Sequence, residues 1–186
     1  MEITDQIFRN ALRGDMQAFE QIVTTYERLV YSIALRFLKN PEDAKDASQE
    51  VFIKVYRNLD KCNDINVLKS WICAITNNTC IDIIRKQKRQ STLSLDEQVE
   101  TEDSSFVFEI QSGEKTPEQQ YIEGEGYELL KKAIENLPID YRSVIVLRDI
   151  HNLSYSEVAE AASINIGTVK SRLARGRAML RKMYAG

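Results

Sequence analysis

A strongly acidic segment divides this chain and limits how it can fold. Residues 91–128 carry 11 acidic side chains and a single basic one, Lys115. The flanking segments are basic: residues 1–90 hold 14 bases and 12 acids, and residues 129–186 hold 10 bases and 5 acids. Because like charges repel and remain hydrated, the acidic segment is unsuited to a hydrophobic core.

The composition of this segment indicates a linker between two domains. From Ser91 to Thr116 it is rich in Ser, Thr, Glu and Gln and has little apolar periodicity, which is typical of solvated linkers. One domain with a long acidic loop is the alternative, but structureless loops of about 20 residues are rare inside compact domains. We therefore predict small domains at residues 1–90 and 117–186, joined by a flexible acidic linker at residues 91–116.

The apolar periodicity predicts an all-α protein. Only 7 Gly and 3 Pro occur, too few for the many tight turns of an all-β fold. Apolar residues instead recur at spacings of three and four. The expected helices cover approximately Asp5–Leu12, Asp15–Asn40, Pro41–Leu59, Val67–Gln87, Thr116–Leu137, Pro138–Ile150, Tyr155–Ala162 and Thr168–Lys182.

Cysteine and histidine usage argues against a disulfide framework, a metal site or a cofactor. The chain has three cysteines, Cys62, Cys73 and Cys80, and one histidine, His151. Cys73 and Cys80 share a helix face and read as small core residues rather than a thiol switch or metal site. The N-terminus lacks a signal-peptide pattern and no stretch of 18 apolar residues occurs, so we expect a cytoplasmic protein. No spacing typical of a nucleic-acid enzyme is present, and we predict no catalytic residue.

The C-terminal segment has the spacing of a helix–turn–helix. Ser154 and Glu157 form a predicted capping box, and a short turn leads to Thr168, the expected cap of the last helix. That helix carries six basic residues and no acid, which favours binding to a polyanion over a merely solvated basic face. A helix of this kind fits the DNA major groove. The six bases are Lys170, Arg172, Arg175, Arg177, Arg181 and Lys182.

Five motifs in a fixed order make the chain resemble the extracytoplasmic-function class of bacterial RNA polymerase sigma factors, in the sigma-70 family. The resemblance covers nearly the whole chain, with the acidic segment in the expected place. The motifs are Gly14-Asp15-x-x-Ala18-Phe19; Asn40-Pro41-Glu42-Asp43-Ala44-x-Asp46-x-x-Gln49-Glu50-Val51-Phe52; Trp71-Ile72-x-x-Ile75-x-x-Asn78 with Asp82 and Arg85; Leu137-Pro138-x-x-Tyr141-Arg142; and Ile166-Gly167-Thr168-Val169-Lys170-Ser171-Arg172-x-x-Arg175-Gly176-Arg177.

The resemblance implies a transcription initiation factor with two working domains. The first would bind the β and β′ subunits of core RNA polymerase and open the −10 promoter element. The second would read the −35 element through its helix–turn–helix. Sigma factors of this class usually also have an anti-sigma partner, often anchored in the membrane. The alternative is a two-domain regulator that binds an operator without polymerase.

One helix face of the first domain is the predicted polymerase-binding surface. Asp43, Asp46, Gln49 and Glu50 follow one another at helical spacing, opposite Val51, and the family's counterpart binds the β′ clamp helices. The alternative is that these acids only stabilise the helix dipole from the first turn of the helix, although this accounts poorly for Glu50.

Candidates for −10 DNA lie further along the first domain. Asn78 is suited to a base edge, and Trp71 to either base stacking or the core. Family members commonly have an aromatic residue where this chain has Leu68, which bears on the −10 base preference. The candidates for phosphate contacts are Lys69, Arg85, Lys86, Lys88 and Arg89.

Candidates for −35 DNA lie in the last helix. The resemblance assigns Lys170, Ser171 and Arg175 to base edges, with Thr168 at the start of the helix. Arg172 and Arg177 are better placed for phosphates. Arginine offers a planar fork that suits guanine, whereas lysine offers a mobile point charge.

Overall fold

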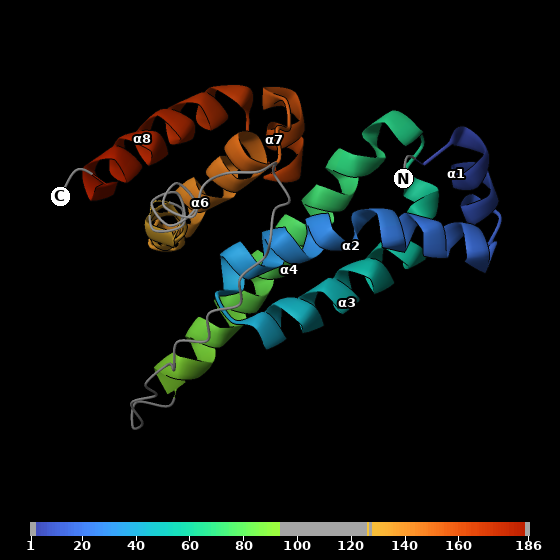
Figure 1. Ribbon diagram of the computed structural model, residues 1–186, viewed down its shortest axis with the longest axis horizontal. Helices are drawn as coiled ribbons and strands as arrows, with labels where there is room; N and C mark the ends of the chain where they lie inside the picture. Colours follow the sequence, from blue (N-terminus) through green and yellow to red (C-terminus); the bar gives the residue numbers. More distant parts are fainter. Residues whose placement is uncertain (1–2, 94–125, 127, 185–186) are drawn as a thin grey trace, which may run out of the picture.

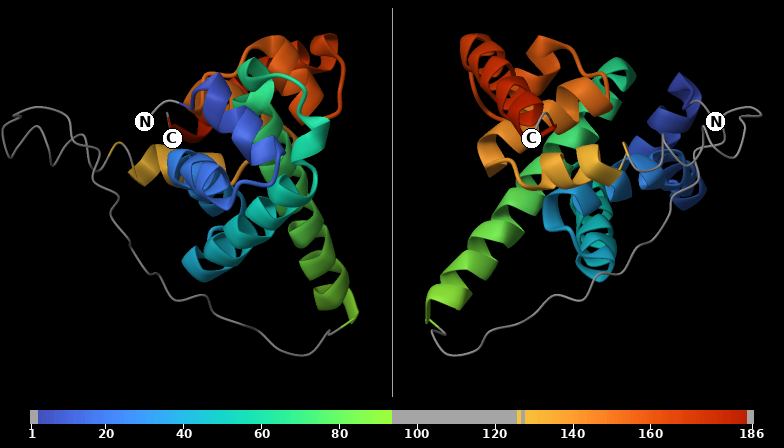
Figure 2. Two further views of the ribbon diagram at one scale, coloured as in Figure 1. Left: turned by 90° about the vertical axis from the view of Figure 1, so that its right-hand side faces the viewer. Right: turned by 60° about the vertical axis from the view of Figure 1, so that its left-hand side comes forward.

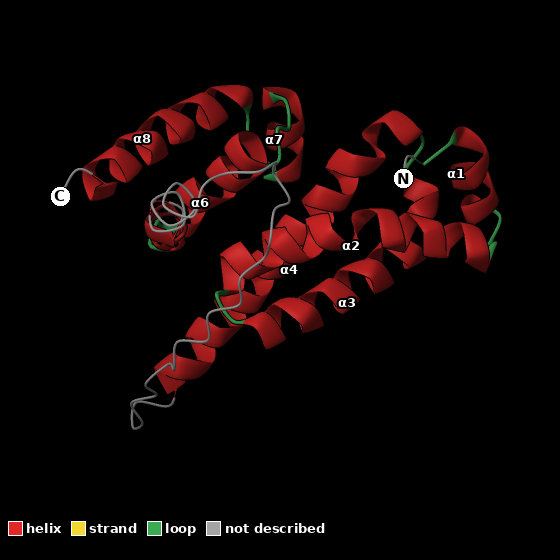
Figure 3. Cartoon of the chain, viewed as in Figure 1, coloured by secondary structure: helices red, strands yellow, loops and turns green. Residues whose placement is uncertain are grey.

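The structure is a computed structural model that describes residues 3–93, 126 and 128–184, and the regular elements among them are all helical (Figure 3). The all-α prediction is therefore confirmed. None of the described helices combines the length and apolar character that crossing a membrane requires. Most of the predicted linker, and the start of the helix expected at Thr116, lie outside the described residues.

The N-terminal domain contains α1 (Asp5–Leu12), α2 (Met16–Leu38), α3 (Pro41–Arg57), the short 3-10 turn η1 (Leu59–Lys61) and α4 (Ile65–Leu93). In the C-terminal domain residues 128–135 are helical. They are followed by α6 (Ile139–Ile145), the wider π-helical turn η2 (Val146–Ile150), α7 (Tyr155–Ala161) and α8 (Ile166–Tyr184). Figure 1 shows the two groups of helices, coloured blue to green and orange to red.

Local capping sets the boundaries of α2 and α3. Asp15 accepts hydrogen bonds from the backbone N–H groups of Gln17 and Ala18, at 2.9 and 3.2 Å, and so begins α2. Lys39 ends α2 in the left-handed conformation, with φ of 64°. Asn40 then caps α3, with proline at the first helical position. The two-residue connection keeps α2 and α3 side by side (Figure 1).

The N-terminal domain has a core of its own, which we call the first core. Its fully buried residues come from α2, α3 and α4, and residues of α1 and η1 complete it. These helices enclose the apolar stripes that the sequence analysis identified. Residues with no exposed surface are Ile22, Val30, Val51, Val55, Leu68 and Ile72.

A second core, which we call the shared core, joins the two domains. It contains Ile33 and Phe37 of α2 and Cys73 of α4, together with Ile145 of α6 and Val158 of α7. The right-hand view of Figure 2 shows the C-terminal helices lying against α4 and α2. Two helical domains were predicted, but this packing between them was not.

Candidate functional site

Capping fixes the two helices of the helix–turn–helix. Ser154 accepts from the N–H of Glu157 at 3.2 Å, and the Glu157 carboxylate accepts from the N–H of Ser154 at 2.7 Å, as predicted. The prediction that Thr168 caps α8 is wrong. The helix begins at Ile166, and the side-chain oxygen of Asn165 accepts from the Thr168 N–H at 2.7 Å. Asparagine is the stronger cap, so Thr168 lies in the first turn.

The outer face of α8 presents the residues predicted to face DNA bases. Val169 and Leu173 are 0% and 2% exposed and pack inward. Lys170, Ser171 and Arg175 are exposed on the outer face. A helix that offers cations and a hydroxyl along one solvent-facing side can enter a major groove and meet base edges there.

Two of the six bases of α8 are paired within the domain. Arg172 lies 3.2 Å from a carboxylate oxygen of Asp140. Arg177 donates from Nε and from its terminal nitrogen to the two carboxylate oxygens of Asp149. This hydrogen bonding raises the pKa of Arg177, so it stays charged. The absence of acids from this helix therefore does not leave all six charges uncompensated, because the acids that pair with these two arginines come from α6 and η2.

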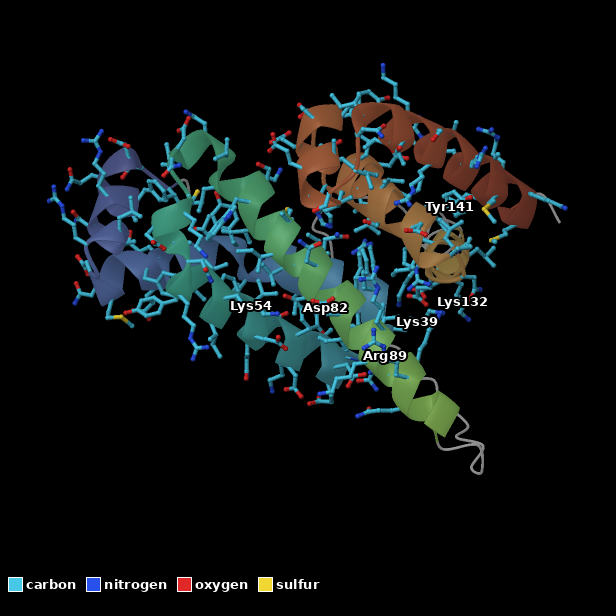
Figure 4. All side chains as sticks on the ribbon, turned by 180° about the vertical axis from the view of Figure 1, so that it is seen from behind. Lys39, Lys54, Asp82, Arg89, Lys132 and Tyr141 are labelled. Carbon is cyan, nitrogen blue, oxygen red and sulfur yellow. The ribbon has the colours of Figure 1, made fainter. Side chains whose placement is uncertain are left out.

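The second half of α4 is a cationic strip. Asn78, Asp82, Arg85 and Arg89 follow one another at spacings of four, three and four residues, and all are exposed, so they share one face. Figure 4 labels Asp82 and Arg89 along this helix, which extends past the rest of the domain. Lys86 and Lys88 are also exposed. This surface can follow a phosphate backbone, with Asn78 at its N-terminal end.

Three further residues at the start of α4 differ in how accessible they are. Leu68 is fully buried in the first core, so it is a packing residue that cannot stack on a base. Trp71 is half-buried against the same core, which agrees with the alternative that it is a core residue. Lys69 is exposed, but its Nζ donates to the carbonyl oxygen of His151 at 3.2 Å.

The predicted polymerase-binding face lies on α3. Asp46, Gln49 and Glu50 are exposed, opposite the buried Val51. Glu50 forms an ion pair with Lys54 at 2.7 Å, a residue also labelled in Figure 4. The fourth member, Asp43, is half-buried and accepts from the side chain of Gln87 at 3.3 Å. The acidic and amide side chains therefore share a face as expected.

A groove of about 440 Å³ adjoins this face between α2 and α3. The sequence analysis did not identify it, because its two walls come from different helices. Apolar rings next to exposed polar groups suit docking against another protein surface. The groove is lined by Val23, Glu27, Arg28, Tyr31, Lys45, Ser48, Gln49 and Phe52.

Sequence reasoning missed the buried polar residues Asn77, Arg142 and Ser143, which are 0%, 8% and 2% exposed. One signal could have pointed to Asn77. It lies four residues after Cys73 and three before Cys80, so it interrupts an apolar helix face and needs a buried polar partner there.

All three cysteines are buried, as predicted. Burial raises the pKa of Cys73 and of Cys80 to about 12, so neither thiol ionises readily near neutral pH. Among the described residues, no group of three or more His, Cys, Asp or Glu side chains is arranged to hold a metal ion.

Comparison with known proteins identifies two regions that match family models. The family model for sigma-70 region 2 matches residues 22–90, and the model for sigma-70 region 4 matches residues 127–180. The ECF RNA polymerase sigma factor SigW of Bacillus subtilis is 37% identical over 170 residues, which are 91% of this chain and 90% of SigW. The ECF RNA polymerase sigma-E factor of Escherichia coli K12 is 33% identical, over 95% and 92% of the two chains.

Solved structures share the fold. The sigma factor RpoE from Bartonella quintana, in complex with the anti-sigma factor NepR, matches with a TM-score of 0.71 at 24% identity, over 90% of this chain and 97% of that one. CnrH, in complex with the cytosolic domain of CnrY, matches with a TM-score of 0.64 at 20% identity, over 95% and 94%.

These matches do not favour a stand-alone operator-binding regulator, because both matched regions belong to sigma-70 factors and the relatives matched over most of their length are sigma factors. The chain therefore belongs to the extracytoplasmic-function subfamily of sigma-70 factors, transcription initiation factors that bind core RNA polymerase and direct it to promoters.

Proposed function

We propose that α8 reads the −35 promoter element through Lys170, Ser171 and Arg175. The observation that carries this proposal is their exposure together on the outer side of the second helix of the helix–turn–helix. Arg175 offers guanine a two-pronged hydrogen bond. Arg172 and Arg177 leave their carboxylate partners, Asp140 and Asp149, and contact phosphates instead. Thr168 lies at the end of α8 that enters the groove.

The exposed strip on α4 is the proposed −10 surface. Asn78 contacts a base edge, while Arg85, Lys86, Lys88 and Arg89 follow the backbone of the separated strand. Lys69 joins them when it leaves the His151 carbonyl. Trp71 can stack on a base only through the part of its ring that the first core leaves uncovered, so we assign the main role to Asn78.

The α3 face and the adjoining groove form the proposed surface for core polymerase, on its β and β′ subunits. Asp43, Asp46, Gln49 and Glu50 supply charge and hydrogen bonding that select the partner and orient it. Phe52 in the groove supplies apolar area. Exposed ion pairs contribute little net affinity, so most of the binding energy comes from the groove.

The remaining assignments follow from this role. We propose that the protein has no catalytic residue and acts in the cytoplasm, where promoter DNA and polymerase lie. An anti-sigma factor is a further proposed partner, in one form anchored in the membrane, since the sigma factor RpoE, which shares the fold, is described in complex with the anti-sigma factor NepR.

Run-off transcription with purified core polymerase on a promoter library tests the proposal. The wild-type chain is expected to create new start sites. The double variant Lys170→Ala with Arg175→Ala should lower transcription from promoters that need the −35 element by about 30-fold or more, since each base contact contributes about 1–3 kcal/mol. Binding to core polymerase, measured separately, should not change.

The matched control removes two charges from the same helix. Arg181→Ala with Lys182→Ala lies in the last turn, where both side chains are exposed, and should weaken all promoters by a similar small factor. Absence of new start sites would refute the sigma-factor role for this chain. Loss of core binding in the Lys170 and Arg175 variant would show that these residues were assigned wrongly.

A further inference from the structure

One acidic residue interrupts the cationic strip of α4. Asp82 is the single acid among the 29 residues of this helix, which also carries five bases. It lies four residues after Asn78 and three before Arg85, so it shares their face, and its side chain is exposed. Figure 4 shows Asp82 on this helix, with Arg89 further along. Neither the core nor the proposed phosphate contacts account for an acid at this position.

The carboxylate of Asp82 is unpaired. Among the residues that the structure describes, it has neither a hydrogen-bond partner nor an ion pair, although Lys86 follows it at the spacing that favours such a pair in a helix. The acids beside α8 differ, because Asp140 and Asp149 each pair with an arginine of that helix. Asp82 therefore does not hold a cation of the strip in place.

An unpaired carboxylate on a DNA-binding surface needs a hydrogen-bond donor from the DNA. Each phosphate that the strip contacts brings negative charge close to Asp82, and this repulsion lowers the affinity unless the carboxylate is compensated. The DNA backbone consists of acceptors, whereas base edges carry amino groups that donate. The partner that suits Asp82 is therefore a base.

Among the four bases, cytosine matches a carboxylate best. On the major-groove edge guanine presents two acceptors, adenine an amino group beside the acceptor N7, and thymine the acceptor O4 beside a methyl group. Cytosine presents an amino donor with no acceptor next to it. A carboxylate that accepts from N4 of cytosine therefore meets no repelling lone pair, and it rejects a carbonyl oxygen in the same place.

Helix geometry places this contact beside the one proposed for Asn78. Four residues of helix rise about 6 Å, and successive bases of B-form DNA lie about 3.4 Å apart along a strand. Where the helix follows the DNA, side chains one helical turn apart reach bases one or two steps apart. The Asn78 amide and the Asp82 carboxylate can therefore contact neighbouring bases of one promoter element.

We propose that Asp82 is a specificity-determining residue of the −10 surface, and that its carboxylate accepts a hydrogen bond from the amino group of a cytosine close to the base that Asn78 contacts. This inference rests on the proposed −10 surface. The five bases of α4 supply affinity that is similar for every sequence. Asp82 makes binding depend on one base, because a wrong base leaves its charge uncompensated among the phosphates.

Transcription by the full chain with core polymerase, from a promoter library randomised across the −10 element, tests this proposal. The wild-type holoenzyme should favour cytosine about tenfold at one position. Asp82→Ala should remove that preference and leave the preferences at other positions unchanged. Asp82→Asn has an amide that both accepts and donates, so it should use thymine at that position about as well as cytosine.

A chemically modified promoter tests the contact itself. Deoxyuridine opposite deoxyadenosine, in place of the favoured cytosine pair, exchanges the amino group for a carbonyl oxygen without adding a methyl group. The wild-type holoenzyme should lose about tenfold in transcription on this promoter. Asp82→Ala should use the two promoters equally, because the variant and the modified base remove the same interaction.

Glu20→Ala is the matched control, because it removes one negative charge from an exposed position on α2. It should leave every base preference unchanged. The proposal is overturned if Asp82→Ala raises transcription from all promoters alike with the base preferences intact, since Asp82 would then only repel phosphates. It is also overturned if the preference that Asp82→Ala removes is for a base other than cytosine. A wild-type holoenzyme whose transcription is insensitive to Asn78→Ala and to Arg85→Ala would instead refute the proposed −10 surface.

Discussion

Two acids form ion pairs with arginines of α8. Asp149 binds both nitrogen donors of Arg177, and Asp140 lies beside Arg172. Each carboxylate positions a guanidinium, and each also competes with phosphate for it. Because these side chains are partly exposed, the pairs contribute little to stability, and their main effect is on DNA binding.

Replacing Asp149 with asparagine should strengthen promoter binding. Arg177 then loses a competing anion and can neutralise a phosphate, so we expect two- to fivefold tighter binding of holoenzyme at low salt. The dependence of log affinity on log salt concentration should steepen by about one. Binding measured over a salt series checks both values.

The parallel variant Asp140→Asn tests whether removing the acid of the second ion pair also strengthens promoter binding. It should act in the same direction through Arg172, whose partner is a single oxygen at 3.2 Å. Weaker promoter binding in either variant would show that the acid positions its arginine for DNA more than it competes for it.

Adjacent asparagines on α4 illustrate what the sequence could not reveal at this scale. Asn78 was identified as a DNA candidate, and its exposure agrees with that role. Asn77 was not identified, because its partners Ser143 and Ala161 lie 66 and 84 residues away in the chain. Helical periodicity places a residue on a face but does not identify what covers that face.

At the level of elements, helix starts were predictable where a single strong cap precedes an apolar stripe. Asp15, Asn40 and Ser154 each cap the helix that was expected after them. The start of α8 was missed because Asn165 and Thr168 are both acceptable caps, and only the folded turn decides between them. The close packing of α6 against α8 was also beyond the sequence, since it depends on a glycine whose neighbours are more than 30 residues away.

Gly176→Ala should destabilise the C-terminal domain. A Cβ there would lie 3.1 Å from Cγ1 of Ile145 and 3.4 Å from Cβ of Tyr141, and Ile145 is 1% exposed and cannot easily move. Overpacking costs about 1–3 kcal/mol, and the better helix propensity of alanine offsets about 1 kcal/mol of it. Urea denaturation should therefore show a net loss of about 1 kcal/mol.

Ala178→Gly measures the propensity term alone, because Ala178 is exposed on the same helix. It should lower the unfolding free energy by about 1 kcal/mol. If Gly176→Ala stabilised the protein by that amount instead, the contact between α6 and α8 would have room for a methyl group, and Gly176 would not be required for close approach.

At the scale of the whole molecule, the charge pattern predicted two domains but not their mutual packing. The shared core takes Phe37 and Cys73 from one side of the acidic segment and Val158 from the other. Each belongs to an apolar stripe that could equally have been buried within its own domain. The hydrogen bonds between the domains could likewise not be predicted, because sequence spacing relates only residues that are near one another in the chain.

The single histidine lies at the interface between the two domains and should make their packing sensitive to pH. His151 faces Arg36 of α2 and Lys69 of α4, and its Nε2 lies 3.4 Å from the Ser32 hydroxyl. Burial, followed by the two cations, lowers the pKa of His151 from 6.5 to about 4. When the domains separate, His151 regains its ordinary pKa and binds a proton more readily. The contribution of neutral His151 to the packing of the two domains is therefore fully present above pH 6.5 and is lost progressively as the pH falls toward 4.

Between pH 7.5 and pH 5.5 the ratio of molecules with separated domains to molecules with packed domains should rise about tenfold. Most carboxylates stay ionised in this range, so the change can be assigned to the histidine. Scattering profiles of the free protein at the two pH values measure the ratio. In His151→Gln, which keeps a polar side chain of similar length but does not titrate, the profile should be independent of pH. An equal expansion of the variant at pH 5.5 would mean that other groups open the protein, and that His151 only fills space at the interface.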